Sequence, residues 1–442
     1  MALLINWPKN ALLDPVLDKI KTSQIFASLK RRNFRLFWTG QCISLIGTWM
    51  QNVAQAWLVL ELTKSAFWLG VVNAIQFLPI LFFSLYAGTI IDRFSKRRIL
   101  IFTQILMMIL ALILAVDTLL HTVVLWHVLI IAGLLGLSNC LDMPTRQSFL
   151  VELVGSGDLR NAIILNSAIF NAARVLGPSI AGIVIARVGT GTCFLINGIS
   201  FIPVITGIVM IKPVIPSATP TDLVLLEKTP PVPKFIQPLQ NPGALTEILA
   251  GLRFVAKAPV ILSTVILMAF LNVFTFNFNV LIPLFAKNVF CGDAQLFGFL
   301  MTAIGTGALL GTLVLAANSR KPPKTRTVAF AAIAICVFEL LITPVKSYYL
   351  AYLILFVVGI SMITYSTTSN ALIQTQTPHH LRGRVMSIYT LVFAGFSPFG
   401  SFFSGFIAHQ WGAPFALGLG AVTGLVAVIV LLIRFPKVFS II

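Results

Sequence analysis

Apolar stretches of about 20 residues or more recur along almost the whole chain, and short polar segments separate them. A helix needs about 20 predominantly apolar residues to cross the hydrocarbon core of a bilayer. The pattern therefore predicts an all-α membrane protein with twelve transmembrane helices. The predicted spans are residues 36–60, 66–91, 98–119, 122–144, 161–186, 190–211, 259–284, 295–317, 327–345, 348–372, 385–409 and 413–433.

A polar, proline-rich segment interrupts this pattern between the sixth and seventh spans. Eight of the 23 prolines lie between residues 213 and 242, which is typical of a linker without a core of its own. Leucine and isoleucine then recur at helical spacing from residue 245 to residue 252, which predicts a short helix at the membrane surface. We therefore predict a basic, amphipathic tail (1–35), an N-terminal six-helix bundle (36–211), a cytoplasmic linker with the interfacial helix (212–257), a C-terminal six-helix bundle (258–434) and a cytoplasmic tail (435–442).

The charge distribution predicts how the chain is oriented. Charged residues make up 10% of the chain, whereas about a quarter of a soluble domain is charged. If the N-terminus is cytoplasmic, 26 of the 31 lysines and arginines fall in cytoplasmic segments, as the positive-inside rule requires. The net charge of +18 therefore predicts cytoplasmic termini and contact with the lipid bilayer, and no nucleic-acid partner.

No motif indicates an enzyme, a cofactor or a metal site. The chain lacks a Walker-type phosphate loop, an EF-hand pattern and an HExxH motif. Its five cysteines are scattered, mostly within predicted spans, so no disulfide framework is indicated. We expect no catalytic residues, no cofactor and no metal.

The segment Gly88–Arg98, with the sequence GTIIDRFSKRR, lies between the second and third spans. An acid is followed by a group of bases, and a glycine lies one turn before the acid, where a neighbouring helix could approach closely. One interpretation is a positive anchor of the kind that every multi-pass protein needs, and the other is a conformational gate. The gate residues would be Gly88, Asp92, Arg93, Lys96 and Arg97.

This segment closely resembles the loop between helices 2 and 3 of the major facilitator superfamily, except that Ser95 replaces a glycine. The residues Ser28–Gln51 resemble the opening of a bacterial branch that includes the enterobactin exporter and the drug:proton antiporter-3 group. The resemblance implies the major facilitator fold, with two six-helix bundles, and a monomer in the bacterial inner membrane. It also implies proton coupling and a gate whose charge pairs close the cytoplasmic side.

The fifth span contains a second motif. Ala173-x-x-x-Gly177-Pro178-x-x-Ala181-Gly182 resembles the span-5 motif of exporters in this superfamily, with alanine replacing two glycines. The resemblance implies export, and a Gly-Pro pair is a physical route to a hinge. The alternative is an ordinary kink beside a buried arginine. The residues of this motif are Arg174, Gly177, Pro178 and Gly182.

Polar residues line one face of the first span at steps of three and four. Such a stripe faces either a water-filled cavity or hydrogen-bonding partners on other helices, and we favour the cavity. Weaker polar faces occur in spans 4, 7 and 10, and in the superfamily these spans line the central cavity with span 1. The predicted cavity residues are Gln41, Ser44, Thr48, Gln51, Gln55, Asn139, Asn272, Thr275, Asn279, Ser361, Tyr365 and Thr368.

Several ionisable residues lie in or beside spans. Asp142, Arg146 and Glu152 flank the inner end of span 4, where they would form a second charge cluster with the loop after span 2 or lie at the surface. Glu339 lies in span 9 and is either a proton site or paired with a neighbour. A lone histidine, His127, is more often packed than a proton carrier.

The two halves of the chain are similar to each other. Gly136–Leu150 matches Gly359–Ile373 at an offset of 223 residues, and Gly191 matches Gly412 at an offset of 221. Because six spans restore the orientation of the chain, this predicts a parallel six-plus-six repeat.

The resemblance and the polar faces together predict a secondary transporter that works by alternating access. An uncharged, amphipathic cavity suits export of a siderophore or a drug. A lysophospholipid or other lipid is the alternative substrate. A third hypothesis is a non-transporting membrane scaffold or sensor of the same fold.

Overall fold

The computed structural model describes residues 28–211, 244–317, 322–378, 381–436 and 438, and these residues form helices and turns without strands. Residues 1–27 of the predicted tail (1–35) and most of the predicted linker lie outside the described residues, although helix α8 (Ala244–Lys257) confirms a helix before span 7. The other helices are α2 (Arg32–Thr63), α3 (Ala66–Arg93), α4 (Lys96–Leu119), α5 (Leu125–Val188), α6 (Thr190–Val209), α9 (Pro259–Phe274), α10 (Phe278–Leu284), the π-helix η2 (Phe285–Val289), α11 (Ala294–Ala317), α12 (Thr325–Ile342), α13 (Tyr348–Gln376), α14 (Arg382–Gly395), α15 (Ser397–Trp411) and α16 (Ala413–Arg434).

Within the described residues, eleven helical segments are long and apolar enough to cross a membrane. The first predicted span, α2, has 32 residues but is not among the eleven, because its polar stripe lowers its mean hydropathy. Helix α5 comprises spans 4 and 5, which meet at Gly155, where φ is 69°. With α2, the described chain therefore contains the twelve predicted helices.

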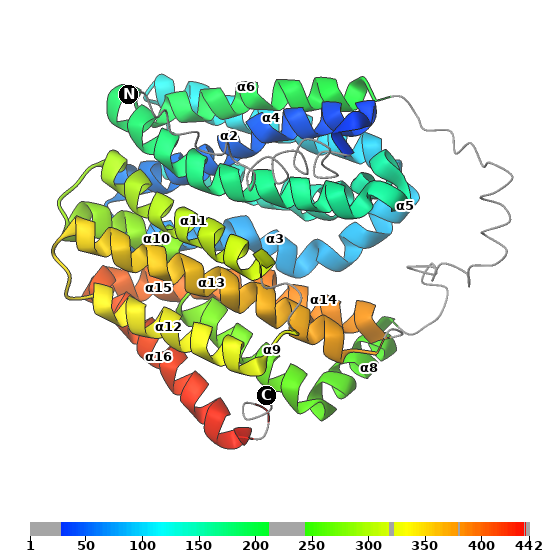
Figure 1. Cartoon of the computed structure of the whole chain (residues 1–442). Coiled ribbons are helices and arrows are strands. Elements are labelled where there is room, and N and C mark those ends of the chain that lie inside the picture. Colours follow the sequence, from blue (N-terminus) through cyan, green and yellow to red (C-terminus); the bar gives the residue numbers. More distant parts are fainter. Residues whose placement is uncertain (1–27, 212–243, 318–321, 379–380, 437, 439–442) are drawn as a thin grey trace, which may run out of the picture.

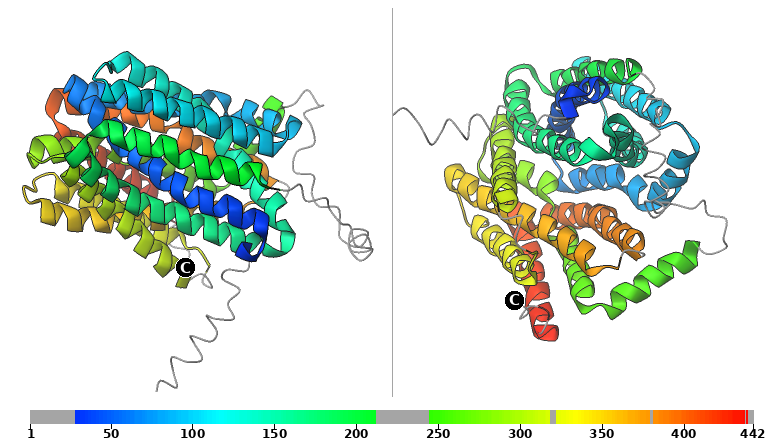
Figure 2. Two further views of the ribbon diagram at one scale, coloured as in Figure 1. Left: turned by 90° about the horizontal axis from the view of Figure 1, so that it is seen from above. Right: turned by 45° about the vertical axis from the view of Figure 1, so that its right-hand side comes forward.

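Helices α2–α6 pack with one another, and α8–α16 form a second group beside them (Figure 1). Figure 2 shows the two groups from two further directions. The end at which α2 begins carries Arg31, Lys96 and Arg97 from the first group and Arg382 and Arg384 from the second, and we call it the basic end. In Figure 1 the two groups diverge towards this end, on the right, and converge towards the opposite end.

Span 7 is broken, whereas the apolar pattern predicted one helix over 259–284. Helix α9 ends at Phe274 and α10 begins at Phe278. The side-chain amide of Asn277 donates to the carbonyl of Val273 at 2.8 Å, which is the acceptor that the Asn277 backbone N–H would use in a continuous helix. The amide therefore replaces a helical hydrogen bond and stabilises the break.

Two glycines with positive φ correct one detail of the predicted repeat. Gly189 (φ 83°) precedes α6, and Gly412 (φ 86°) precedes α16. Their offset is 223 residues, as for Gly136 and Gly359. The predicted match between Gly191 and Gly412 was therefore wrong by two residues, because the shared feature is a left-handed turn and not the first apolar turn of the helix.

Two glycine contacts join the groups towards the opposite end. A Cβ on Gly405 of α15 would lie 2.7 Å from the Cα of Gly70 on α3. A Cβ on Gly298 of α11 would lie 2.9 Å from the Cα of Gly182 on α5. Gly182 and Gly405 are again 223 residues apart, so the two helix crossings are related by the internal repeat. Only glycine permits backbones to approach this closely.

Gly88 makes no comparable contact. Among the described residues, no atom lies within 4 Å of the position that its Cβ would occupy. The expectation that another helix approaches closely at this glycine is therefore wrong for this conformation, because the two groups of helices diverge at the basic end.

We predict that Gly298→Leu opens the end opposite to the basic end, because the leucine side chain would collide with the backbone of α5. A cysteine at Ser65, whose Oγ lies 3.5 Å from His409 Nδ1 of the other group, reports this opening. Its labelling rate by a maleimide in purified protein should rise about tenfold. Cys42 and Cys291 are first replaced by serine, since the other three cysteines are buried.

Gly383→Ala is the matched control, since nothing lies within 4 Å of its Cβ position. An unchanged labelling rate in Gly298→Leu would show that this crossing does not hold the end closed.

Candidate functional site: a buried charge pair, an amide pocket and a groove

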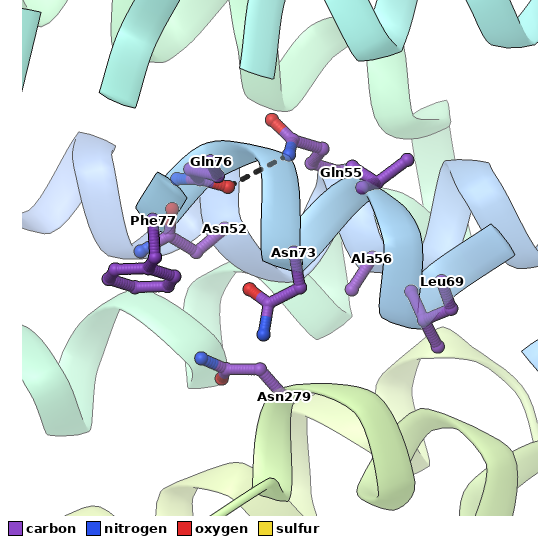
Figure 3. Close-up of a pocket in the computed structure, with 9 residues that line it drawn as sticks. Asn52, Gln55, Ala56, Leu69, Asn73, Gln76, Phe77 and Asn279 are labelled. Carbon is purple, nitrogen blue, oxygen red and sulfur yellow. Dashed lines mark hydrogen bonds between the residues drawn. The ribbon is translucent and has the colours of Figure 1, made fainter. Parts of the chain in front are cut away.

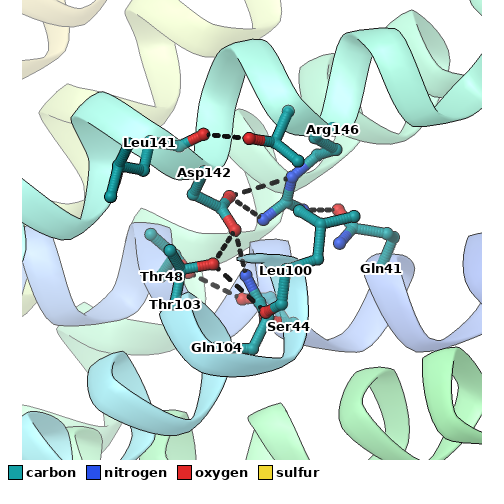
Figure 4. A network of polar contacts seen from close by, with 10 residues as sticks. Gln41, Ser44, Thr48, Leu100, Thr103, Gln104, Leu141, Asp142 and Arg146 are labelled. Atoms are coloured by element: carbon teal, nitrogen blue, oxygen red, sulfur yellow. Dashed lines mark hydrogen bonds and ion pairs between the residues drawn. The ribbon is translucent and has the colours of Figure 1, made fainter. Parts of the chain in front are cut away.

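Asp142 and Arg146 form an ion pair inside the first group of helices (Figure 4). Asp142 is 2% exposed, and its Oδ1 accepts hydrogen bonds from Thr103 Oγ1 at 2.9 Å and from Gln104 Nε2 at 2.7 Å. Arg146 lies one turn later on α5 and also donates to Gln41 on α2. A buried pair of this kind persists only when further hydrogen bonds satisfy it. The network therefore fixes α2, α4 and α5 to one another.

The polar stripe of α2 is used mainly for such contacts between helices. Gln51 accepts a hydrogen bond from the buried amide of Asn197 on α6 at 2.5 Å. Gln55 donates to Gln76 on α3 at 3.0 Å. Thr48 bonds to the carbonyl of Ser44 in its own helix. The polar stripe of α2 points towards α3, α5 and α6. The structure therefore favours the interpretation that the stripe forms hydrogen bonds with other helices over the interpretation that it lines a water-filled cavity.

A small polar pocket lies where α2, α3 and α10 meet (Figure 3). Five carboxamides line it, from Asn52, Gln55, Asn73, Gln76 and Asn279. In Figure 3, Asn73 and Asn279 point towards each other from the two groups of helices. Gln55 and Asn279, which were both predicted to line a cavity, thus line the same pocket. The other three amides, from Asn52, Asn73 and Gln76, were not among the predicted cavity residues.

The other predicted cavity residues of spans 7 and 10 lie inside the second group. Asn272 and Thr275 bond to carbonyls of their own helix, at Met268 and Leu271. Tyr365 is fully buried, with its ring 6.0 Å from that of Phe276. Ser361 and Thr368 are less than 9% exposed. Asn139 on α5 is half-buried.

A groove between α13 and α14 near the basic end presents a different face of α13. It has a volume of about 500 Å³, which is within the usual range for small-molecule sites. Uncharged polar and aromatic side chains line it: Ser366, Thr367, Asn370, Gln374, Tyr389 and Phe393. The sequence does not single out this face, because Ser361, Tyr365 and Thr368 follow helical spacing equally well on the buried side.

The loop between α3 and α4 is bound to neighbouring helix ends. Lys96 forms an ion pair with Glu152 of α5, as one of the two interpretations of Glu152 expected. Arg97 donates to the carbonyls of Ile208 and Val209 at the end of α6, at 3.1 and 2.6 Å. These orphan carbonyls carry the negative end of the helix dipole, so a guanidinium is favourable there. The side chain of Asp92 lies outside the described residues, and its gate role stays a prediction.

The span-5 motif lies at the junction of the two groups. Gly177 packs against Trp49 and Ile46 of α2, and Gly182 packs against the start of α11. The guanidinium of Arg174 lies 6.0 Å from the ring centre of Trp49, and its Nη2 is 3.7 Å from Met362 Sδ on α13. Its backbone carbonyl lies beside Gly305 of α11.

At the end opposite to the basic end, Lys287 of η2 reaches the other group. Its Nζ lies 3.5 Å from the carbonyl of Leu60 and 5.5 Å from the ring centre of Trp57. The indole N–H of Trp57 donates to Glu61 at 2.7 Å. The sequence does not predict this contact, because the contact depends on the π-helix, which no local pattern indicates.

Two other expectations concern ionisable residues. His127 Nδ1 lies 2.6 Å from Asp117 Oδ2 at the end opposite to the basic end. His127 is therefore paired at the surface of the helix bundle. Glu339 is 1% exposed, and neither of its oxygens has a hydrogen-bond partner among the described residues. Within the described part of the chain, no three His, Cys, Asp or Glu residues are grouped so as to hold a metal ion.

Residues 23–440 match the model of the transmembrane secretion effector family, a group within the major facilitator superfamily. The chain belongs to this family. The transporter is 25% identical over 379 residues to the staphyloferrin A transporter of Staphylococcus aureus, covering 86% of this chain and 90% of that one. It is 29% identical over 403 residues to the multidrug efflux pump Tap of Mycobacterium tuberculosis, covering 86% and 89%.

Solved structures agree on the fold. A POT family transporter superposes with a TM-score of 0.70 at 11% identity, covering 92% of this chain and 97% of that one. The family and these neighbours confirm the predicted all-α, multi-pass membrane architecture. The curated relatives are transporters and not enzymes, as the sequence predicted.

We predict that Arg146→Met destabilises the transporter by about 3–5 kcal/mol, because it leaves the buried Asp142 without its cation. Thermal unfolding in detergent measures this loss. The double variant Asp142→Asn/Arg146→Met should recover most of it.

Lys96→Met is the control, since its partner Glu152 is half-exposed and an exposed pair contributes at most about 1 kcal/mol. Equal losses for Arg146→Met and Lys96→Met would show that burial of the first pair has no energetic consequence.

Proposed function

We propose that the transporter exports a small amphipathic molecule, a siderophore or a drug, by alternating access driven by the proton gradient. Relatives named for staphyloferrin A transport and multidrug efflux support this substrate class. We further propose that it acts as a monomer in the bacterial inner membrane, with both termini in the cytoplasm.

The groove between α13 and α14 carries the proposal. It offers amide and hydroxyl groups from Asn370, Gln374 and Thr367 beside the rings of Tyr389 and Phe393. None of the described residues that line it is charged. Such a surface binds a molecule that has aromatic faces and hydrogen-bonding groups, and it does not select for a strongly charged substrate.

The conformation also supports export by alternating access. The glycine crossings and Lys287 join the two groups at the end opposite to the basic end. The positive-inside rule assigns the basic end to the cytoplasm. On this assignment the structure is the inward-open state, in which an exporter accepts its substrate. The gate residues of the loop between α3 and α4, Asp92 included, would then pair on the cytoplasmic side in the other state.

The function is tested by measuring the accumulation of fluorescent drugs and of a catecholate siderophore in cells that lack their own exporters. Cells with the transporter should accumulate less of at least one compound, and a protonophore should abolish the difference. If no compound differs although the protein is present in the membrane, lipid transport or a non-transporting scaffold becomes the better hypothesis.

Within this assay, we expect Asn370→Leu and Gln374→Leu each to reduce export about tenfold, a loss of about 1.4 kcal/mol of transition-state stabilisation. Each change removes an amide from the groove while keeping a similar volume. The control is Leu353→Ala, which alters an exposed apolar position at the other end of α13. Unchanged export in both groove variants, at equal abundance, would exclude the groove as the binding surface.

A further inference from the structure

Glu339 is a buried acid that belongs neither to the network around Asp142 nor to the groove between α13 and α14. It lies on α12, one turn before the helix ends at Ile342, and is 1% exposed. Both carboxyl oxygens lack a hydrogen-bond partner among the described residues. Native proteins almost always satisfy such buried groups, so an unsatisfied carboxyl indicates a functional role.

No described cation lies near enough to pair with Glu339. Helix α12 packs against α13, α16 and α9. Helix α9 has no ionisable side chain, and the only one on α16 is Arg434 at the basic end. Lys346, in the turn after α12, is exposed and forms no ion pair with Glu339. The other titratable groups on these elements are Cys336 and Arg326 of α12, and Tyr348, Tyr349, Tyr352 and Tyr365 of α13.

Further buried polar groups lie on α12 and α13. Cys336 is one turn earlier than Glu339 on α12. Tyr365 and Ser369 lie one turn apart on α13, and neither hydroxyl has a hydrogen-bond partner among the described residues. Glu339 is thus one of several buried polar groups in this part of the second group that the described residues leave unsatisfied.

Cys336, one turn before Glu339 on α12, lies near the break in span 7. A Cβ on Gly424 of α16 would lie 2.9 Å from Cys336 Sγ and 3.0 Å from Thr275 Cγ2. Thr275 is the first residue after the end of α9. Gly420 of the same helix packs against the carbonyl of Phe274. A change at this break would therefore change the packing around Cys336 and Glu339.

The charge on Glu339 affects the free energy of the conformation seen here. An ionised carboxylate without a partner in a dry interior costs several kcal/mol. The surroundings in this structure therefore accommodate the neutral, protonated acid. The ionised form favours a conformation in which water or a cation reaches the carboxylate.

We propose that Glu339 is a proton-binding site of the transporter, and that it binds its proton more tightly when the end opposite to the basic end is closed than when that end is open. Proton binding adds one O–H bond to the carboxylate and neutralises it, and release returns the proton to water. By linkage, a group that binds its proton more tightly in the closed state favours that state at low pH. Raising the pH therefore shifts the population towards the open state.

The inference rests on the proposed gradient-driven cycle, but its test needs no substrate. Spin labels at positions 65 and 409 report the distance between the two groups at the end that is closed, because Ser65 and His409 are in contact there. The labels are placed in a background with Cys42 and Cys291 replaced by serine. Replacing His409 also removes the one histidine that could produce a pH response at the labelled contact.

With Glu339 intact, we expect the long-distance population to rise at least about threefold between about pH 5.5 and about pH 8.5. Glu339→Gln keeps the shape of the neutral acid, so it should stay closed across this range. Asp293→Asn is the matched control, since Asp293 is an exposed residue that caps α11 and asparagine caps equally well. This control should respond to pH as the protein with Glu339 intact does.

A pH response in Glu339→Gln equal to that of the control would overturn the proposal, as would a protein with Glu339 intact whose distances do not depend on pH. Export that fails in cells while the labels respond as expected would instead contradict the proposed function and leave the proton site supported.

Discussion

Polar groups inside a membrane protein need partners, and most of this architecture follows from that requirement. Neither lipid nor a dry helix interior offers water for hydrogen bonding, so each buried amide or charge needs a partner in its own backbone or on another helix. Gln51 with Asn197, Gln55 with Gln76, and Arg146 with Asp142 and Gln41 are contacts of this kind. They connect α2 to α6, α3 and α5, and they make the first group of helices a single packed unit. Among the described residues, Glu339 has no such partner, which distinguishes it from the other buried charges.

The two groups of helices are held together differently. Their contacts near the closed end use glycine, where backbones touch without side chains between them, and a few contacts such as Asn73 with Ser401 and Ser179 with Thr302. Close packing of this kind depends on shape and not on strong hydrogen bonds, so it can separate without leaving charges exposed to lipid. A strongly bonded interior within each group and a weakly polar contact between the groups suit motion of one group against the other.

The break in span 7 and the glycines of α16 form a second place where the chain can change conformation. Asn277 satisfies the Val273 carbonyl through its side chain, so the helix can be interrupted without loss of a hydrogen bond. The freed carbonyl of Phe274 lies against Gly420, at the level of the residues that surround Cys336. Movement of the second group and protonation of its buried acid can therefore be linked through the same few residues.

The sequence by itself determined the twelve helices, the repeat and the family, because apolar length, glycine spacing and the loop motif are local properties of the chain. It also identified Asp142, Arg146 and Glu339 as unusual, since charges in apolar spans are rare. It could not decide which partner each polar face meets. The steps of three and four in α2 fit a cavity or a neighbouring helix equally well, and two faces of α13 follow the same period. Only the tertiary structure decided between them, because the partner of a buried polar group is set by helices that are distant in sequence.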